Sequence, residues 1–278
     1  LSDIEARFPS LSPDGKYLFF CGDDGNFYWA DRSIIDRLNP AGSQAQSIPA
    51  DSLYLGQTPP GSTPKVFPLQ VAGGSFAAER IAISGDDKTI YYQELDGYTS
   101  LDGKPHSERI KYYRYAGGRW YGPHALFEGY IAPAFTPSED TMFIQRVAGQ
   151  SYYSVRSDTG WGTPMRWTSR LSFDHYLQVT AKGHYFASST PANSLGGLDR
   201  SRILTSGKDT TATSLGLPLN TAATDYDFFV AKDESFMIVA LHGRLGVSYP
   251  KRDGSWTNPK SLGKDINGRL VVADLASM

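Results

Sequence analysis

A short segment with the pattern strand, tight turn, strand recurs along this chain. Its clearest copy is residues 8–20, where Ser12-Pro13-Asp14-Gly15 supplies the turn, because proline presets φ and glycine accepts positive φ. The flanking residues are aromatic and aliphatic, as β-strands prefer. Weaker copies lie at residues 81–92, 133–144, 177–187 and 228–239. Five copies of one hairpin predict a repeat architecture.

A second motif follows three of the hairpins and completes the repeat. Trp120, Trp161 and Trp256 each begin a Trp-x-x-Pro turn, and a glycine stands one or two positions before each of them. The segments that precede these turns alternate between apolar and polar residues, which indicates a third strand. The repeat unit is then four antiparallel strands, the blade of a β-propeller. We predict that each tryptophan packs between neighbouring blades.

The spacing of the turns predicts a single all-β domain over residues 1–278, a β-propeller with five blades of four antiparallel strands. A ring of six blades is the alternative. The later turns lie 52, 44 and 51 residues apart, close to the roughly 40–50 residues of one blade. The first interval, from Ser12 to Ser84, is 72 residues long and rich in Pro, Gly and Ser. We interpret residues 39–74 as a linker or strap between the first and second blades.

Four longer motifs carry a family resemblance. They are SPDGKYLFF at residues 12–20, YWADRSIIDRLNP at 28–40, YLGQTPPGSTPKVF at 54–67 and DGSWTNPKSLGKDIN at 253–267. Together they resemble secreted bacterial β-propellers of the WD-like, TolB-type repeat class, and this implies a periplasmic or secreted protein. In that family the motifs at 12–40 close the chain, whereas here they open it. The resemblance therefore implies a circularly permuted chain order, with residues 41–49 as the joining segment.

Net charge, hydropathy and cysteine content restrict the kinds of partner that this chain can have. A net charge of -2 over 278 residues gives no electrostatic basis for binding nucleic acid. No apolar run approaches the roughly 20 residues that span a bilayer, and no signal peptide is visible. The single cysteine, Cys21, lies in a predicted strand, which favours a buried core residue. We expect a monomer with no nucleic-acid partner and no membrane span.

Propellers bind ligands mostly at one end of the central channel, near the ends of the innermost strands. When the five hairpins are aligned on their turns, polar residues recur at the start of each predicted inner strand. These residues are expected to ring one mouth of the channel. Besides Glu5, the candidates for ligand binding are Arg7, Glu79, Arg80, Tyr130, Asp174, His175, Asp225, Tyr226 and Asp227.

The chemistry of these candidates allows several roles. Arg7 and Arg80 have the geometry to clamp a carboxylate or a phosphate. His175 and Tyr130 have groups that transfer protons. Asp225 and Asp227, beside the last copy of the hairpin, have the oxygen ligands that a cation such as calcium needs. No motif indicates a metal or a cofactor. The structural alternative is that all these groups pair with one another and satisfy the backbone at the strand ends.

No catalytic motif accompanies this cluster. The chain contains no G-x-S-x-G, no H-E-x-x-H and no Walker loop. We therefore expect a non-catalytic binding or scaffold propeller that recognises a peptide, a glycan or an envelope partner at one face. The alternative is a carbohydrate-active hydrolase or lyase with its site at the channel mouth. A third hypothesis is a permuted propeller with no function beyond folding.

Overall fold

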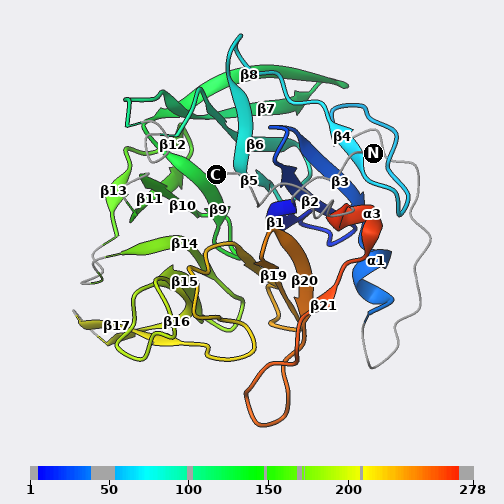
Figure 1. The fold of residues 1–278 in the computed structure, drawn as a ribbon. Helices are drawn as coiled ribbons and strands as arrows, with labels where there is room; N and C mark the ends of the chain where they lie inside the picture. The colour runs from blue at the N-terminus through cyan, green and yellow to red at the C-terminus, as the bar shows by residue number, and fades with distance from the viewer. Residues whose placement is uncertain are drawn as a thin grey trace.

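The computed structural model describes residues 6–38, 54–98, 103–146, 149–167, 171, 173–206 and 209–268. Five antiparallel sheets surround a central axis, the channel axis of a propeller, and each sheet is one blade of a ring (Figure 1). The prediction of an all-β propeller with five four-stranded blades is therefore confirmed, in preference to six blades.

The blades follow one another along the chain, and within each blade the strands pair in chain order, beginning with the innermost. Blade 1 contains β1 (Ala6–Leu11), β2 (Tyr17–Gly22), β3 (Phe27–Asp31) and β4 (Lys65–Phe67), and blade 2 contains β5 (Phe76–Ile83), β6 (Thr89–Leu95), β7 (Glu108–Ala116) and β8 (Arg119–Glu128). Blade 3 contains β9 (Ile131–Phe135), β10 (Thr141–Arg146), β11 (Gln150–Ser157) and an outer strand in two pieces, β12 (Gly160–Trp161) and β13 (Met165–Arg166). Blade 4 contains β14 (Asp174–Val179), β15 (Tyr185–Ser189), β16 (Asp199–Ser206) and β17 (Asp209–Ser214), and blade 5 contains β18 (Phe228–Val230), β19 (Met237–Leu241), β20 (Arg244–Ser248) and β21 (Lys260–Ser261).

The repeated turns are held by their own side chains. In blade 1 the Ser12 hydroxyl donates to the Asp14 carboxylate at 2.6 Å, and the backbone N–H of Tyr17 donates to the Ser12 hydroxyl at 3.0 Å. The Ser84 hydroxyl donates to Asp86 at the same 2.6 Å in blade 2. These short-range bonds fix the turn that joins each inner strand to the next strand, because they satisfy turn backbone groups locally.

The outer strand of blade 1 comes from the segment that the sequence predicted to be a linker or strap. Strand β4 pairs with β3, and Tyr54, earlier in the same segment, is fully buried against Tyr17 and Trp29. The described part of the segment, residues 54–74, thus completes blade 1 before the chain enters blade 2. Residues 39–53, which include the predicted joining segment, lie outside the described residues.

Aromatic side chains join neighbouring blades. The indole N–H of Trp161 in blade 3 donates to the Tyr91 hydroxyl of blade 2 at 3.0 Å, while its ring stacks on Phe135 of its own blade at 5.7 Å. The prediction that the repeated tryptophans pack between blades is confirmed at Trp161. Cys21 is also buried as predicted, with 4% of its surface exposed.

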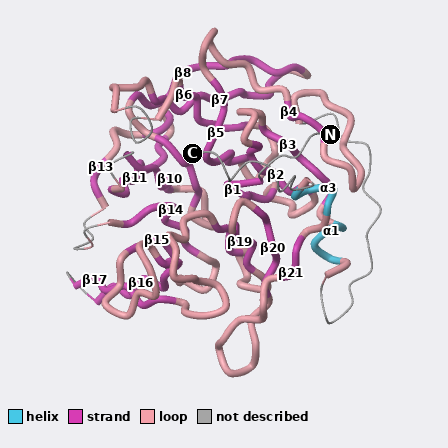
Figure 2. Tube along the Cα trace, in the orientation of Figure 1, coloured by secondary structure: helices cyan, strands magenta, loops and turns pink. Residues whose placement is uncertain are grey.

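Two short helices, α1 (Ser33–Asp36) and α3 (Lys264–Asn267), are the helices of the described residues. They lie close together beside blades 1 and 5 (Figure 2), and Ile35 and Ile266 bury in the same apolar cluster. In the described part of the chain, no helix has the length and apolarity to cross a membrane.

Candidate functional site

The inner strand of blade 2 has two residues that its ladder of hydrogen bonds leaves unpaired. Ala78 pairs with Gln93 and Ile81 pairs with Tyr92, so Glu79 and Arg80 have no opposing residue on β6. The inner strands of blades 1, 3 and 4 each have a smaller bulge of one extra residue. A bulge re-aims the side chains that it contains. Both Glu79 and Arg80 leave the ladder and are buried, with 4% of their surface exposed.

Arg80 crosses the channel and contacts two other blades. Its Nη1 donates to the backbone carbonyl of Tyr176 in blade 4 at 3.3 Å, and its Nη2 donates to the carbonyl of Phe228 in blade 5 at 2.8 Å. The guanidinium carbon lies 4.7 Å from the centre of the Tyr176 ring and 5.7 Å from that of Phe228. Burial lowers the pKa of Arg80 to about 10, so the side chain stays cationic at neutral pH.

Glu79 lies beside Arg80 and is held by two tyrosines. The Tyr176 hydroxyl donates to its Oε2, and the Tyr98 hydroxyl donates to its Oε1 at 3.0 Å. Burial raises the pKa of Glu79 to about 7, because the charged carboxylate is poorly solvated there. We call Glu79, Arg80, Tyr98, Tyr176 and Phe228 the middle layer of the channel. This layer connects blades 2, 4 and 5 across the centre of the ring.

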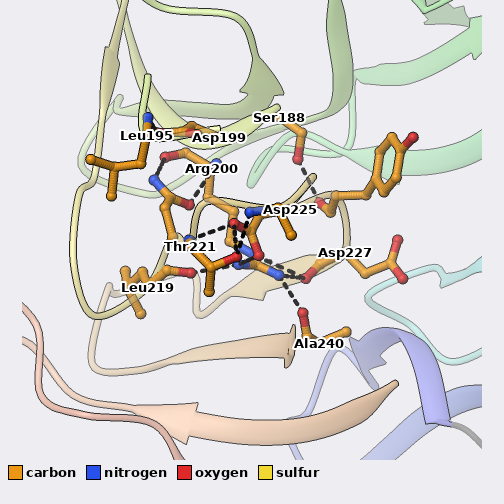
Figure 3. Close-up of polar contacts among 12 residues, drawn as sticks. Ser188, Leu195, Asp199, Arg200, Leu219, Thr221, Asp225, Asp227 and Ala240 are labelled. Atoms are coloured by element: carbon orange, nitrogen blue, oxygen red, sulfur yellow. Dashed lines mark hydrogen bonds and ion pairs between the residues drawn. The ribbon is translucent and has the colours of Figure 1, made fainter. Parts of the chain in front are cut away.

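A second buried arginine, Arg200, connects blades 4 and 5 (Figure 3). Its Nη1 forms an ion pair with Asp225 at 3.1 Å, and its Nε and Nη2 donate to the carbonyl of Asp227 at 3.2 and 3.1 Å. Nη2 also donates to the carbonyl of Ala240. Arg200 is fully buried, and the hydrogen bonds that its guanidinium donates fix the segment that leads into β18. The structure therefore uses Asp225 to neutralise a buried cation.

Among the hollows that the described residues line, one lies at the turn end of the inner strands and another beside the start of the inner strand of blade 5. The larger, about 330 Å³, is lined by inner-strand residues of all five blades, Arg80 among them, and by hairpin-turn residues of blades 1, 3 and 5. We call it the turn-end funnel; residues of its wall include Leu11, Ile83, Phe135, Val179 and Phe236. The smaller, about 260 Å³, lies where the inner strand of blade 5 begins. We call it the strand-entrance hollow; residues of its wall include Arg7, Asp225, Tyr226, Asp227 and His242.

The predicted site residues divide into groups. Four of them, Arg7, Asp225, Tyr226 and Asp227, line the strand-entrance hollow together. Burial raises the pKa of Asp227 to about 6, although the arginines near it act in the opposite direction. The structure therefore brings this part of the predicted rim together, and it places Arg80 at the wall of the other hollow.

The remaining predicted residues make contacts within and between blades. Tyr130 packs edge to face on Tyr152, and the guanidinium of Arg146 lies 5.3 Å from both ring centres. The backbone carbonyl of Asp174 accepts a hydrogen bond from the Ser151 hydroxyl at 2.7 Å, which joins blades 3 and 4. The ring of His175 lies 4.1 Å from that of Phe173 and 6.3 Å from that of Tyr226. Glu5 lies outside the described residues.

Sequence reasoning missed the glutamines that support the inner strands. The Gln93 side chain accepts the N–H of Ala132 at 3.0 Å, and the Gln145 side chain accepts the N–H of Tyr176 at 2.7 Å. Both acceptors reach from the second strand of one blade to a bulge residue of the next, where φ is 53° or 57°. A signal was present, because Gln93 and Gln145 each stand nine positions after the first residue of their turn, Ser84 and Thr136. Sequence reasoning also did not identify Arg200, which forms the buried ion pair, or Tyr176 of the middle layer.

Within the described part of the chain, no cluster of three or more His, Cys, Asp or Glu side chains is arranged to hold a metal ion. Asp225 and Asp227, the predicted cation ligands, differ in their surroundings. Asp225 forms an ion pair with Arg200 and accepts from the N–H of Thr221 at 2.6 Å. The Asp227 backbone accepts from the same arginine. The proximity of Arg200 does not favour a cation between them.

A scan of family models and a search of curated proteins found no match for this chain. Solved structures do match it. A TolB structure from Agrobacterium tumefaciens has a TM-score of 0.53 at 13% identity, over 93% of this chain and 80% of that one. TolB from Acinetobacter baumannii has a TM-score of 0.51 at 13% identity, over 94% of this chain and 57% of that one. A structure of oligogalacturonate lyase with manganese has a TM-score of 0.46 at 12% identity, over 93% of this chain and 65% of that one.

These identities support a conclusion about the fold, while the circularly permuted chain order stays a prediction. The similarity to the two TolB structures extends over more than nine-tenths of this chain. It agrees with the five sheets and their strand order. The chain thus has the fold of a TolB-type β-propeller.

Proposed function

We propose that this chain is a non-catalytic binding propeller that recognises a peptide, a glycan or an envelope partner at the turn-end funnel. The observation that carries the proposal is the construction of the funnel, because all five blades contribute to its wall. A volume of about 330 Å³ lies within the range of ligand sites in proteins, which combine apolar walls with a few polar groups. Leu11, Ile83 and Phe236 supply apolar wall, and Arg80 supplies a buried cation.

The contacts of the charged groups favour binding over catalysis. Glu79 and Asp225 are buried and hydrogen-bonded to other groups of the protein. A catalytic acid or base must reach a proton of the substrate within hydrogen-bond distance. Groups whose oxygen or nitrogen atoms already hold the blades together serve the fold instead. The resemblance of the motifs to secreted propellers supports a periplasmic or secreted location, and we propose a monomer.

Two screens with matched variants test the proposal. The wild-type protein is screened against immobilised random hexapeptides and against a glycan array. Ala134→Trp places a bulky ring in the turn-end funnel, and Ala223→Trp does the same in the strand-entrance hollow, since the two alanines line these hollows. We expect ligands that bind wild type and the Ala223 variant, and that lose at least tenfold in affinity for the Ala134 variant. Circular dichroism confirms that both variants are folded.

Two outcomes contradict the proposal. Ligands that bind the Ala134 and Ala223 variants equally well place recognition elsewhere on the molecule. The absence of any peptide or glycan ligand, with folded wild-type protein, removes these two ligand classes and leaves a large protein surface as the partner.

The second candidate function, a carbohydrate-active hydrolase or lyase, is favoured by one observation. Asp227 lines the strand-entrance hollow beside Arg7, and burial raises its pKa to about 6. A carboxyl group with a pKa near the working pH is suited to proton transfer. Incubation with neutral and acidic oligosaccharides, followed by measurement of reducing ends and of unsaturated products, tests this function. Activity that disappears in Asp227→Asn and persists in Ala134→Trp supports an enzyme in place of a binding propeller.

A further inference from the structure

The floor of the turn-end funnel is closed by the middle layer. Arg80 lines the funnel, and behind it Tyr176 and Phe228 are buried, with 5% and 1% of their surfaces exposed. Their contacts with Arg80 cross the channel, from blade 2 to blades 4 and 5. The strand-entrance hollow is lined by a different set of residues. The funnel therefore admits the end of a chain more readily than a loop that must enter and leave.

The charge at this floor lacks a contacting anion. Arg80 donates to two backbone carbonyls, which are neutral, and no carboxylate of the described residues forms an ion pair with it within 4.0 Å. Glu79 and Asp227 are the nearest acids that act on its charge. Glu79 already accepts from two tyrosine hydroxyls. A guanidinium has five N–H donors in a planar fork, and two carbonyl contacts leave donors for a ligand.

The acidic groups around the funnel are occupied by groups of the hairpin turns. Asp14 accepts from the Ser12 hydroxyl and pairs with Lys16 at 2.8 Å. Glu139 accepts the N–H of Gly85 at 2.9 Å. Asp233 accepts the hydroxyl and the N–H of the serine two positions on. These bonds hold the three carboxylates at the turns, so they compete weakly for Arg80. Arg32, which pairs with Asp36 at 3.1 Å, and Lys232, which is exposed, add two more cations to the lining.

We propose that the turn-end funnel receives the C-terminal end of an extended peptide, and that the terminal carboxylate binds Arg80. The proposal rests on the binding function proposed above and names its ligand. A carboxylate and a guanidinium match as two parallel N–H···O bonds, and burial of the pair strengthens it relative to water. The last apolar side chains of such a peptide would lie against Leu11, Ile83 and Phe236 of the wall. Lys232 at the same lining favours an anionic ligand further.

A pair of peptide arrays tests the ligand chemistry directly. Random hexapeptides are immobilised through their N-termini and made in two versions, one with a free C-terminal carboxylate and one with a C-terminal amide. We expect wild-type protein to bind selected acids at least tenfold more tightly than the matching amides. Arg80→Gln should remove this preference. The Arg80 variant also loses two hydrogen bonds between blades, so a surface substitution is tested as well. Lys232→Glu should weaken the binding of peptide acids severalfold and change the binding of peptide amides little. Lys251→Glu, outside the funnel, is its matched control.

The possible outcomes distinguish a failure of the carboxylate proposal from a failure of the proposed binding function. Equal binding of acids and amides, with loss of both in Ala134→Trp, overturns the carboxylate proposal and leaves a peptide-binding funnel. Absence of binding to either version overturns the carboxylate proposal, and glycan binding lost in Ala134→Trp would then retain the funnel as the site. N-acetyl-leucine is tested as a competitor. If it competes as strongly as the best hexapeptide acid, the funnel is a site for small free acids and the peptide assignment is wrong.

Discussion

The two ends of the channel are built in different ways. At the turn end, side-chain bonds within each hairpin turn join residues two positions apart, as between Ser12 and Asp14 or Ser84 and Asp86. In the middle layer and at the strand-entrance end, partners lie far apart in sequence, and the Arg80 side chain bonds a carbonyl 148 positions away. The turn contacts of Ser12 and Ser84 repeat from blade to blade, whereas the contacts of Arg80 and Arg200 occur once each. The difference predicts that single substitutions cost far more stability at the long-range contacts.

The largest loss is expected for Arg200→Met. This change leaves Asp225 buried without its cation and removes the donor to the carbonyls of Asp227 and Ala240. Breaking one partner out of a buried pair costs about 3–5 kcal/mol. Denaturant unfolding followed by tryptophan fluorescence measures the effect. Arg202→Met is the control on the same strand, because that side chain is half-exposed and stacks on Phe186. Equal losses of stability in the two variants would mean that the buried contacts of Arg200 contribute no more than those of a half-exposed arginine, which would contradict the comparison.

The pH dependence of stability tests the middle layer. The folded-state pKa of Glu79, about 7, lies above its ordinary value of 4.5, so the folded protein holds this proton more tightly than the unfolded chain. Its contribution to the free energy of unfolding is fully present below about pH 4.5 and is lost as pH rises through about 7. At about 1.4 kcal/mol per pKa unit, the loss is on the order of 3 kcal/mol. Asp227, with a pKa raised to about 6, acts in the same direction.

Glu79→Gln should flatten this fall between pH 4.5 and 7, as measured by denaturant unfolding at several pH values. Glu234, which hydrogen-bonds the Thr180 hydroxyl at the turn end, is the control with the opposite sign. Its pKa is lowered, since hydrogen bonds from Thr180 and His184 outweigh the effect of burial. Glu234→Gln should therefore reduce the loss of stability on acidification. A wild-type stability that rises from pH 4.5 to 7 would contradict the role assigned to Glu79.

A smaller loss is expected for Gln145→Leu. The substitution leaves the N–H of Tyr176 without its acceptor in a buried setting, which costs about 1–3 kcal/mol. Gln150→Leu, at a half-buried position of β11, is the matched control. Thermal unfolding by circular dichroism measures both. If the Gln145 variant is as stable as the control, the glutamine does not support the bulge of blade 4.

The smallest effect is expected for Asp86→Ala at the turn end. The variant loses the acceptor of the Ser84 hydroxyl and of the Lys88 N–H, and since water replaces it at this site, the cost is about 1 kcal/mol. Denaturant unfolding with and without added calcium measures it. A loss comparable to that of Arg200→Met would remove the distinction between the two ends, and strong calcium dependence would point to a bound cation in the turn.

Features that depend on contacts between residues close in sequence were predicted correctly, and features that depend on contacts between blades were predicted less well. The turn residues at Ser12 and Ser84 predicted the blades, because a turn needs only residues within five positions. The candidate rim was predicted in part: Arg7 and Asp227 meet at one hollow. Arg80 was assigned to the same rim, yet the two-residue bulge of β5 places it in the middle layer. The size of a bulge depends on how neighbouring blades pack, and no local pattern reports it.

The sequence by itself determined the repeat, the all-β class and the turns that join the inner strands, since these depend on backbone preferences and side-chain bonds over a few residues. Only the tertiary structure decided which charges are buried. Arg80 and Glu79 are adjacent in sequence, but their partners Phe228 and Tyr176 come from two other blades. Desolvation acts on a charged group according to what surrounds it in space. The closed floor of the funnel and the pKa of Glu79 therefore arise when the ring closes.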